Sequence, residues 1–424
     1  MLQAERSPAP PCAPPGLFHS VGLRALLLLS LAGCAGPRPA AHRVLTGIDV
    51  LEADGFRELQ GLKVGLITNH TGQDSRGRPT AEVLAGAKGV TLAALFSPEH
   101  GLTGRVEEGA VSSAAVRIGR LFVPVHSLYS GGAAGMRPRP EDLRGLDALV
   151  FDIQDVGARF YTYLATMGMA LEEAAKAGIA FIVLDRPDPI NGTTVEGPLL
   201  TDLSQPTPTA YFPVPVRHGL TAGEMALLHN AAVHHPKLEI VRLRGWKRRM
   251  WYDQTGLPWV PPSPNLPDLA AAALYPGLGL LEASNLSVGR GTPHPFGWIG
   301  APWLDAERLA RLLNEARLDG VSFSAQDYTP AKSLYAGQRC PGVRITITDR
   351  DRLRPLAVFR HINQALRETH RSEFKWRWEE ARQMTGSAEF QRIYETDGDP
   401  LKMLVLCNRA AEEFEKSRQP YLLY

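Results

Sequence analysis

Short apolar runs that end in polar residues recur along the first half of the chain. Four of them have the length and the β-branched content of buried strands, and they are Leu62–His70, Val90–Phe96, Ala148–Ile153 and Ala180–Leu184. Stretches with helical spacing precede the second and fourth runs, TAEVLAGAKG and ARFYTYLATMGMALEEAAKAG, the latter closed by Gly178. Strands that alternate with helices form right-handed βαβ units, so the pattern predicts an α/β fold with a largely parallel sheet covered by helices on both faces.

The chain beyond about residue 300 has another order of elements. WLDAERLARLLNEARLDG is typical of an amphipathic helix, GVRITITDRD of an alternating strand, and PLAVFRHINQALRETH and PLKMLVLCNRAAEEFEKSRQPYLLY of further helices. The chain has 424 residues, more than one compact core usually holds, so we expect two domains. We place the parallel sheet in residues 45–300 and a smaller α+β domain in residues 301–424.

The first 34 residues are predicted to be a signal sequence and not part of the fold. Arg24 precedes an apolar run, Ala25–Ala32, that is too short to span a bilayer and has the length of a signal-peptide core. The segment ends in Leu-Ala-Gly-Cys, which resembles the bacterial lipobox, in which the cysteine, here Cys34, is acylated. An ordinary secretory signal with an incidental cysteine is the alternative. We therefore expect a cell-envelope protein, lipid-anchored on the periplasmic side of a bacterial membrane, with residues 35–44 as a linker.

Composition narrows the class of protein. Hydrophobic residues make up 44% of the chain and charged residues 21%, which is ordinary for a soluble globular protein. The net charge of +2 argues against a large basic surface, and no nucleic-acid-binding signature is present. No G-x-G-x-x-G follows the first strand, and neither a Walker A sequence nor G-x-S-x-G occurs, so no nucleotide is expected as a partner. Cys340 and Cys407 can form one disulfide or stay as thiols.

Polar or titratable residues follow each predicted strand. They are Asn69 and His70, Glu99 and His100, Asp152 and Asp155, and Asp185, Arg186 and Asp188. Parallel sheets bind ligands outside the carboxyl ends of their strands, so these side chains are candidates for a site. Glu99 stands in the turn SPEHG, where His100 can hydrogen-bond to it, and a carboxyl group partly buried under loops can serve as a general acid.

Several of these residues also have a structural interpretation. One of Asp152 and Asp155 can cap the helix that follows, which leaves the other to face the crevice. The two prolines of DRPDPING make a stiff loop, in which Arg186 suits an anionic group of a substrate. Glu172 lies about 13 residues into its helix, roughly 20 Å from the helix start, so this distance favours a structural role.

The loop-rich middle of the chain combines hydrogen-bonding groups with aromatic rings. The stretch NLSVGRGTPHPFGW has both, VRHG contributes Arg217 and His218, and PPSPN contributes Asn265. Polar forks beside aromatic faces are suited to sugar recognition. A glycine-rich connection with aromatic residues in the core is the alternative interpretation.

Seven motifs, in the same order, resemble those of the NamZ-type exo-β-N-acetylmuramidases, glycoside hydrolase family 171, formerly a domain of unknown function. The motifs are FSPEHGL, FDIQDVGARFYTY, VLDRPDPING, VRHGLTAGEMA, PPSPNLP, EASNLSVGRGTPHPF and YLLY, and the resemblance covers residues 45–424. It implies a Rossmann-like catalytic domain, a smaller C-terminal auxiliary domain and an active site in the cleft between them. It also implies release of terminal, non-reducing β-linked N-acetylmuramic acid from peptidoglycan fragments in cell-wall turnover or recycling, without a cofactor or metal.

The resemblance implicates Glu99 as a catalytic residue, with His100 beside it. Glycosidases generally use two carboxyl groups. For the second, Glu172 matches a recurrent position of the family, against the distance argument, and Asp155 and Glu196 are alternatives. The acetamide of the sugar can also act as an internal nucleophile. The stretch EASNLS departs from the pattern of the family, because Ala283 and Ser284 stand where a glycine-threonine pair is expected before the asparagine.

Fourteen residues are candidates for substrate binding. They are Asn69, His70, Asp152, Arg159, Tyr161, Arg186, Asn191, Glu196, Arg217, His218, Asn265, Asn285, Arg290 and Thr292. The lactyl carboxylate of N-acetylmuramic acid needs a cation, ideally the planar fork of an arginine. Arg159, Arg186, Arg217 and Arg290 are the candidates for this cation.

Two other function classes fit parts of the sequence. A metal-dependent hydrolase would use His70, His100 and Asp152 or Asp155 as ligands, although the chain lacks a closely spaced pair of histidines. A non-catalytic lipoprotein of the cell wall would hold sugar in the same cleft without turning it over.

Overall fold

The computed structural model describes residues 43–104, 114–129, 136–204, 206–396 and 400–424. The predicted signal sequence and Cys34 lie outside these ranges. Residues 41–424 form one compact unit, which contains both predicted domains. In the described part of the chain, no helix is long and apolar enough to cross a membrane.

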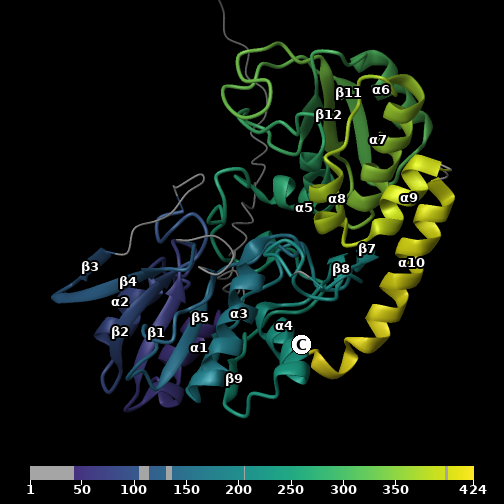
Figure 1. Cartoon of the computed structure of the whole chain (residues 1–424). Coiled ribbons are helices and arrows are strands. Elements are labelled where there is room, and N and C mark those ends of the chain that lie inside the picture. The colour runs from purple at the N-terminus through teal and green to yellow at the C-terminus, as the bar shows by residue number, and fades with distance from the viewer. Residues whose placement is uncertain (1–42, 105–113, 130–135, 205, 397–399) are drawn as a thin grey trace, which may run out of the picture. The chain divides into compact units, whose positions relative to one another are not determined.

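The predicted α/β fold is confirmed by a sheet whose strand order is β3-β4-β2-β1-β5-β6-β9 (Figure 1). Its strands are β1 (Lys63–Thr68), β2 (Thr91–Ser97), β3 (Ala114–Ile118), β4 (Leu121–Ser127), β5 (Ala148–Asp152), β6 (Ala180–Leu184) and β9 (Leu238–Val241). Neighbouring strands are parallel except for β3 and β4, which form an antiparallel hairpin at one edge. Strands β2 to β4 lie on one side of β1, and the later strands β5, β6 and β9 lie on its other side. The strand order therefore reverses between β1 and β5, which is the switch point of the sheet.

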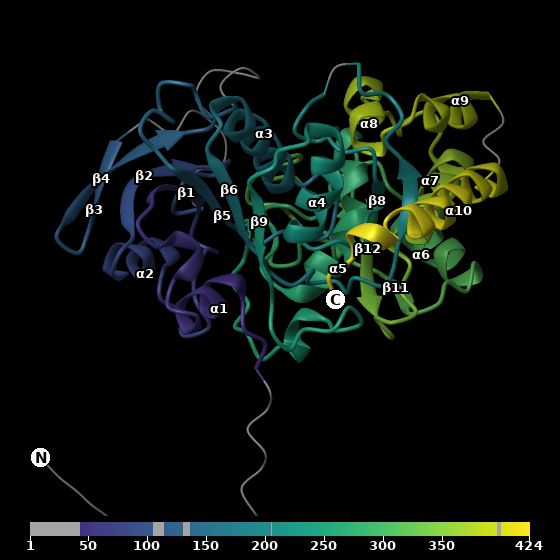
Figure 2. The ribbon, with the colours of Figure 1, turned by 90° about the horizontal axis from the view of Figure 1, so that it is seen from below.

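Helices cover both faces of this sheet (Figure 2). Side chains of β1 alternate between the faces, with Val64 and Leu66 in one apolar cluster and Ile67 in the other. Helices α1 (Gly47–Ala53) and α2 (Thr80–Gly86) pack on the first face. Helices α3 (Thr162–Ala177) and α4 (Ala222–Val233) pack on the second.

Helix α3 starts later than the sequence pattern predicts. We expected it to begin near Arg159, but its first residue is Thr162. Ala158 forms a β-bridge with Arg217, and the amide of Arg159 donates to the carbonyl of Val216, so this stretch is held extended. The helix ends, as predicted, at Gly178, whose φ of 69° is left-handed and favours glycine. The later start brings Thr162 close to the end of β2.

The second half of the chain is built on a small antiparallel sheet in the order β10-β12-β11. Its strands are β10 (Trp298–Gly300), β11 (Val321–Ala325) and β12 (Gly342–Ile347), and a separate antiparallel pair consists of β7 (Glu196–Leu199) and β8 (Pro215–Arg217). The helices of this half are α5 (Leu269–Leu278), α6 (Ala306–Glu315), α7 (Pro355–Thr369), α8 (Trp378–Thr385), α9 (Ala388–Thr396) and α10 (Pro400–Ser417). Short 3-10 turns are Arg57–Leu59, Tyr252–Gln254, η4 (Gly279–Ala283) and Gln419–Tyr421. Strand β10, which ends at residue 300, pairs with β12 of the small sheet. The predicted domain boundary between residues 300 and 301 stays a prediction.

The C-terminal segment returns to the parallel sheet, as Figure 1 shows for the yellow helix α10. Arg418 is buried just after α10, and its Nη1 donates to the carbonyl oxygens of His218 at 3.0 Å and Gly219 at 2.7 Å. The hydroxyl of Tyr424 donates to Oδ2 of Asp185 at 2.6 Å, directly after β6. These contacts join the last residues of the chain to loops at the carboxyl ends of β6 and β8.

Candidate active site

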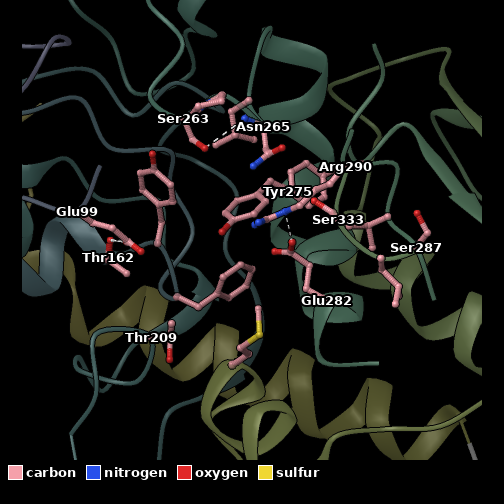
Figure 3. A pocket seen from close by; sticks show the side chains of 18 of the residues that line it. Glu99, Thr162, Thr209, Ser263, Asn265, Tyr275, Glu282, Ser287, Arg290 and Ser333 are labelled. Carbon is pink, nitrogen blue, oxygen red and sulfur yellow. Dashed lines mark hydrogen bonds and ion pairs between the residues drawn. The ribbon is translucent and has the colours of Figure 1, made fainter. Parts of the chain in front are cut away.

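A pocket of about 570 Å³ opens beyond the carboxyl end of β2 (Figure 3). One wall consists of the turn after β2 and the start of α3, with Glu99, His100 and Thr162. The opposite wall comes from the end of α5, η4 and the loop that follows, with Tyr275, Glu282 and Arg290. Thr209, residues 263–266 and 332–334, and Met384 complete the lining. The pocket therefore draws on both halves of the chain.

Glu99 is held in the pocket by the turn and by helix α3. His100 and Gly101 both have left-handed backbones, with φ of 67° and 70°, and this tight turn exposes the Glu99 side chain at the strand end. The hydroxyl of Thr162, the first residue of α3, donates to Oε2 of Glu99 at 2.5 Å. This hydrogen bond restricts the carboxyl group to one orientation.

A second carboxyl group faces Glu99 from the other side of the pocket. Figure 3 shows Glu282 and Arg290 opposite Glu99, with the ring of Tyr275 between the two sides. Glu282 and Arg290 form an ion pair. Burial raises the pKa of Glu282, and the guanidinium of Arg290 opposes this shift. Sequence reasoning missed Glu282, although a single carboxylate in the apolar run YPGLGLLEAS is a usable signal.

Tyrosines fix the aromatic side of the pocket. The hydroxyls of Tyr161 and Tyr163 both donate to the carbonyl of Pro262, at 2.9 and 3.0 Å. The rings of Phe160 and Tyr161 pack edge-on against Tyr275. The motif that contains Asn265 is thereby anchored to the start of α3, and the pocket gains a largely apolar floor suited to a sugar ring.

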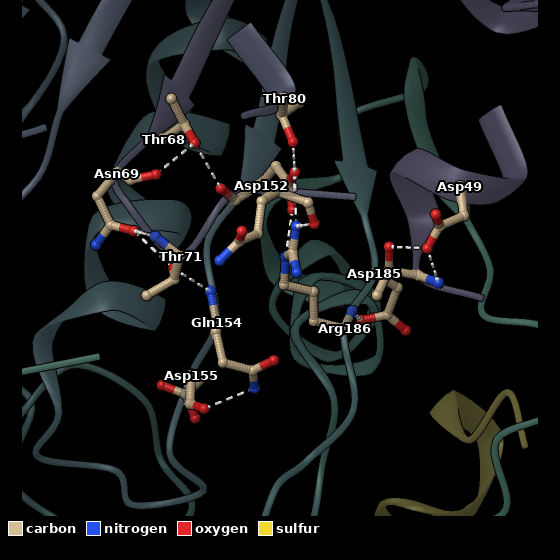
Figure 4. A network of polar contacts seen from close by, with 12 residues as sticks. Asp49, Thr68, Asn69, Thr71, Thr80, Asp152, Gln154, Asp155, Asp185 and Arg186 are labelled. Carbon is tan, nitrogen blue, oxygen red and sulfur yellow. Dashed lines mark hydrogen bonds and ion pairs between the residues drawn. The ribbon is translucent and has the colours of Figure 1, made fainter. Parts of the chain in front are cut away.

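The polar residues at the ends of β1, β5 and β6 bind one another and do not line the pocket (Figure 4). Arg186 donates to both carboxylate oxygens of Asp152, at 2.5 and 2.9 Å, and Thr80 donates to the same carboxylate. Asn69 accepts hydrogen bonds from the amide and hydroxyl of Thr71, at 2.9 and 2.6 Å. The charges of Asp152 and Arg186 are thereby compensated within the fold at the switch point of the sheet, which is a structural role.

Asp155 is buried next to His218 and likewise does not line the pocket. Its Oδ2 accepts from the amide of Gly157 at 2.7 Å and lies 3.8 Å from Nε2 of His218. Burial raises the pKa of Asp155 to about 8, and the nearby carboxyl of Asp188 adds to the shift. Burial also lowers the pKa of His218 to about 3, together with the charges of three surrounding arginines.

Glu172 lies in an ion-pair cluster on α3 that does not line the pocket. It accepts hydrogen bonds from Arg137 at 2.6 Å and Tyr211 at 2.5 Å, and Nε2 of His229 lies 3.0 Å from it. Burial raises its pKa, but the hydrogen bonds from His229, Tyr211 and Arg137 outweigh this effect and lower the pKa to about 2. The cluster ties α3 to α4 and to the loops on either side.

The remaining candidates make local contacts. Glu196 pairs with Arg217 at 3.2 Å and lines a different cavity, of about 340 Å³, beside α7. Asn191 accepts from the amides of Thr193 and Thr194, and the side chain of Asn285 bonds to the backbone of Glu373 and Lys375. Thr292 donates to the carbonyl of Gly289 at 2.6 Å, and Nε2 of His70 lies 2.7 Å from the carbonyl oxygen of Pro261.

Five predicted site residues therefore meet in the pocket, namely Glu99, His100, Tyr161, Asn265 and Arg290. The sequence did not point to Thr162, Ser263, Tyr275, Glu282 and Lys332, which also line it. Within the described ranges, no group of three or more His, Cys, Asp or Glu side chains is arranged to hold a metal ion. Cys340 and Cys407 are both free thiols.

Comparisons with known proteins agree on one family. The model of the N-terminal part of the exo-β-N-acetylmuramidase NamZ matches residues 64–270, and the model of its C-terminal part matches residues 273–424. The peptidoglycan β-N-acetylmuramidase NamZ of Bacillus subtilis is 36% identical over 384 residues, which cover 90% of this chain and 92% of that protein.

Solved structures lead to the same family. A DUF1343 family protein from Bacteroides fragilis superposes with a TM-score of 0.83 at 36% identity, over 92% of this chain and 100% of that chain. A second DUF1343 protein of the same organism has a TM-score of 0.71 at 26% identity, over 90% of this chain and 99% of that chain. From the matches over both halves of the sequence and the shared fold, the chain belongs to the NamZ exo-β-N-acetylmuramidase family.

Proposed function

We propose that this protein is an exo-acting glycoside hydrolase that releases terminal, non-reducing β-linked N-acetylmuramic acid from peptidoglycan fragments. The observation that carries the proposal is the position of Glu99, oriented by Thr162 in a pocket with an aromatic floor. Membership of the NamZ family supports the substrate class. The pocket also supplies a cation, Arg290, for an anionic sugar.

In this proposal Glu99 acts as the general acid. Its carboxyl proton passes to the glycosidic oxygen as the bond to the anomeric carbon breaks, and positive charge develops on the sugar ring. The hydrogen bond from Thr162 holds the carboxyl group while the proton moves. Asp155, Glu172 and Glu196 do not line the pocket, and the carboxylate that does, Glu282, is paired with Arg290. In this proposal the acetamide of the substrate therefore takes the place of the second carboxylate.

The test is hydrolysis by protein that starts after Cys34. Chromogenic β-N-acetylmuramide and β-N-acetylglucosaminide are offered separately, each with and without EDTA. We expect release from the muramide alone and no effect of EDTA. A loss of activity with EDTA that zinc restores would favour the metal-dependent hydrolase. Binding without release from either sugar would favour the non-catalytic wall protein.

We also propose that the mature protein is anchored to a bacterial membrane through a lipid on Cys34 and faces the periplasm. The support is the sequence of residues 1–34, with its short apolar core and the Leu-Ala-Gly-Cys ending. An enzyme so placed would meet wall fragments directly. Mass spectrometry of the mature N-terminus is expected to find an acylated Cys34, and a soluble protein cleaved elsewhere would refute the anchor.

A further inference from the structure

The substrate proposed above differs from N-acetylglucosamine by a lactyl ether that ends in a carboxylate. Of the four arginines considered for this group, three do not line the pocket. Arg186 is bound to Asp152, and Arg217 donates to Glu196 and to the carbonyl of Ile190. Arg159 is buried and donates to the carbonyl of Met384 at 2.6 Å. Arg290 lines the pocket, with 36% of its side chain exposed.

Glu282 determines where the guanidinium of Arg290 points. The ion pair is made through Nε of Arg290, and the carboxyl group of Glu282 is the more buried partner, with 19% of its side chain exposed. The base of Glu282 is fixed, because η4 packs against the core through Leu280 and Leu281. A guanidinium carries donors on all three nitrogens, so an ion pair through Nε is compatible with a second carboxylate at its outer edge.

The two walls of the pocket carry different charged groups. Glu99 stands on one side, and Arg290 with Lys332 on the other (Figure 3 labels Glu99 and Arg290). The side with Arg290 and Lys332 attracts an anionic ligand group, and the side with Glu99 has no lysine or arginine in the pocket lining, which separates the lactyl group from the catalytic acid. Since one sugar ring holds both groups, binding the carboxylate at Arg290 also orients the glycosidic oxygen.

We infer that Arg290, positioned by Glu282, selects N-acetylmuramic acid by binding its lactyl carboxylate. This inference rests on the proposed function, because it names the residue that recognises the lactyl carboxylate of the proposed substrate. Arg290 is the specificity-determining residue, and Glu282 is a positioning residue that acts through it. Lys332, the other lysine or arginine that lines this pocket among the described residues, is the competing assignment.

The experiment compares a chromogenic muramide with its lactyl methyl ester, so that only the charge differs. The parent protein is expected to hydrolyse the acid with a kcat/KM about 10- to 100-fold above that of the ester, the range of a charge-assisted hydrogen bond. Arg290→Gln should bring this ratio close to one, and Arg290→Lys should give an intermediate ratio.

The exposed Arg344 of β12, outside this pocket, is the matched control, and Arg344→Gln should keep the parent ratio. Because Arg290→Gln alone leaves the carboxylate of Glu282 without its ion-pair partner, the double variant Arg290→Gln, Glu282→Gln is measured beside it.

The outcomes separate this inference from the proposed function. An unchanged ratio in Arg290→Gln, or a ratio lost in Lys332→Gln instead, would overturn the assignment to Arg290 while the hydrolase stands. Glu282→Gln should raise KM for the acid and leave kcat nearly unchanged, whereas an equal fall of kcat on both substrates would make Glu282 catalytic. Should the parent hydrolyse neither substrate, the proposed function fails, and calorimetric binding of free N-acetylmuramic acid and its methyl ester still tests Arg290.

Discussion

Glu99→Gln is expected to lower kcat for a β-N-acetylmuramyl disaccharide about 10²- to 10⁴-fold, the usual contribution of a positioned general acid. Glutamine keeps the shape of Glu99 and can still bond to Thr162, but it has no proton to give to the leaving oxygen. The loss should be much smaller for an aryl muramide, since a phenolate leaves without protonation. Steady-state rates on both substrates measure this difference. Equal losses on the two would assign Glu99 a role other than acid.

Glu172→Gln is the matched control on the neighbouring helix, and we expect it to keep most of the activity. Its effect should fall on stability, by about 1–2 kcal/mol at pH 7, because it breaks a half-buried ion-pair cluster. The folded pKa of Glu172, about 2, lies below the usual 4.5, so its contribution is complete above about pH 5 and is lost as pH falls toward 2. Urea unfolding of parent and variant should therefore differ less at pH 3 than at pH 7.

Arg418→Ala is expected to lower the free energy of unfolding by about 3 kcal/mol, the largest stability loss we predict. Arg418 is 4% exposed, and its guanidinium binds the backbone carbonyls of Gly192, Thr193, His218 and Gly219. Removing it leaves several buried acceptors without this donor and breaks one of the contacts that hold the last residues against the parallel sheet. Urea titration monitored by tryptophan fluorescence measures the effect.

Arg409→Ala, in helix α10 just before Arg418, is the control for Arg418. Arg409 is 81% exposed and pairs with Glu413 at 3.0 Å, a surface contact of little energetic value. It should change the unfolding free energy by less than about 0.5 kcal/mol. A similarly small loss for Arg418→Ala would mean that water or a neighbouring donor replaces the guanidinium at those carbonyls.

The sequence by itself determined the parallel sheet and the position of Glu99 along it. Four apolar runs became β1, β2, β5 and β6, because short continuous stretches rich in β-branched residues are typical of strands in a sheet buried on both faces. Glu99 could be assigned to the end of β2, because a turn that directly follows a parallel strand must lie at the carboxyl edge. Each of these features could be predicted because it depends only on the pattern of residues within one short segment of the chain.

Only the tertiary structure decided which of the polar residues at the strand ends line the pocket and which bind one another. Asp152 and Arg186 had the same sequence signal as Glu99, yet they neutralise each other across β5 and β6. Glu282 and Arg290 became part of the site because the fold places η4 and the following loop opposite the start of α3, from which they are far apart in sequence. The physical reason is that burial and partners, not residue type, decide whether a charge is compensated within the fold or faces a ligand, and partners distant in sequence are brought together by the fold alone.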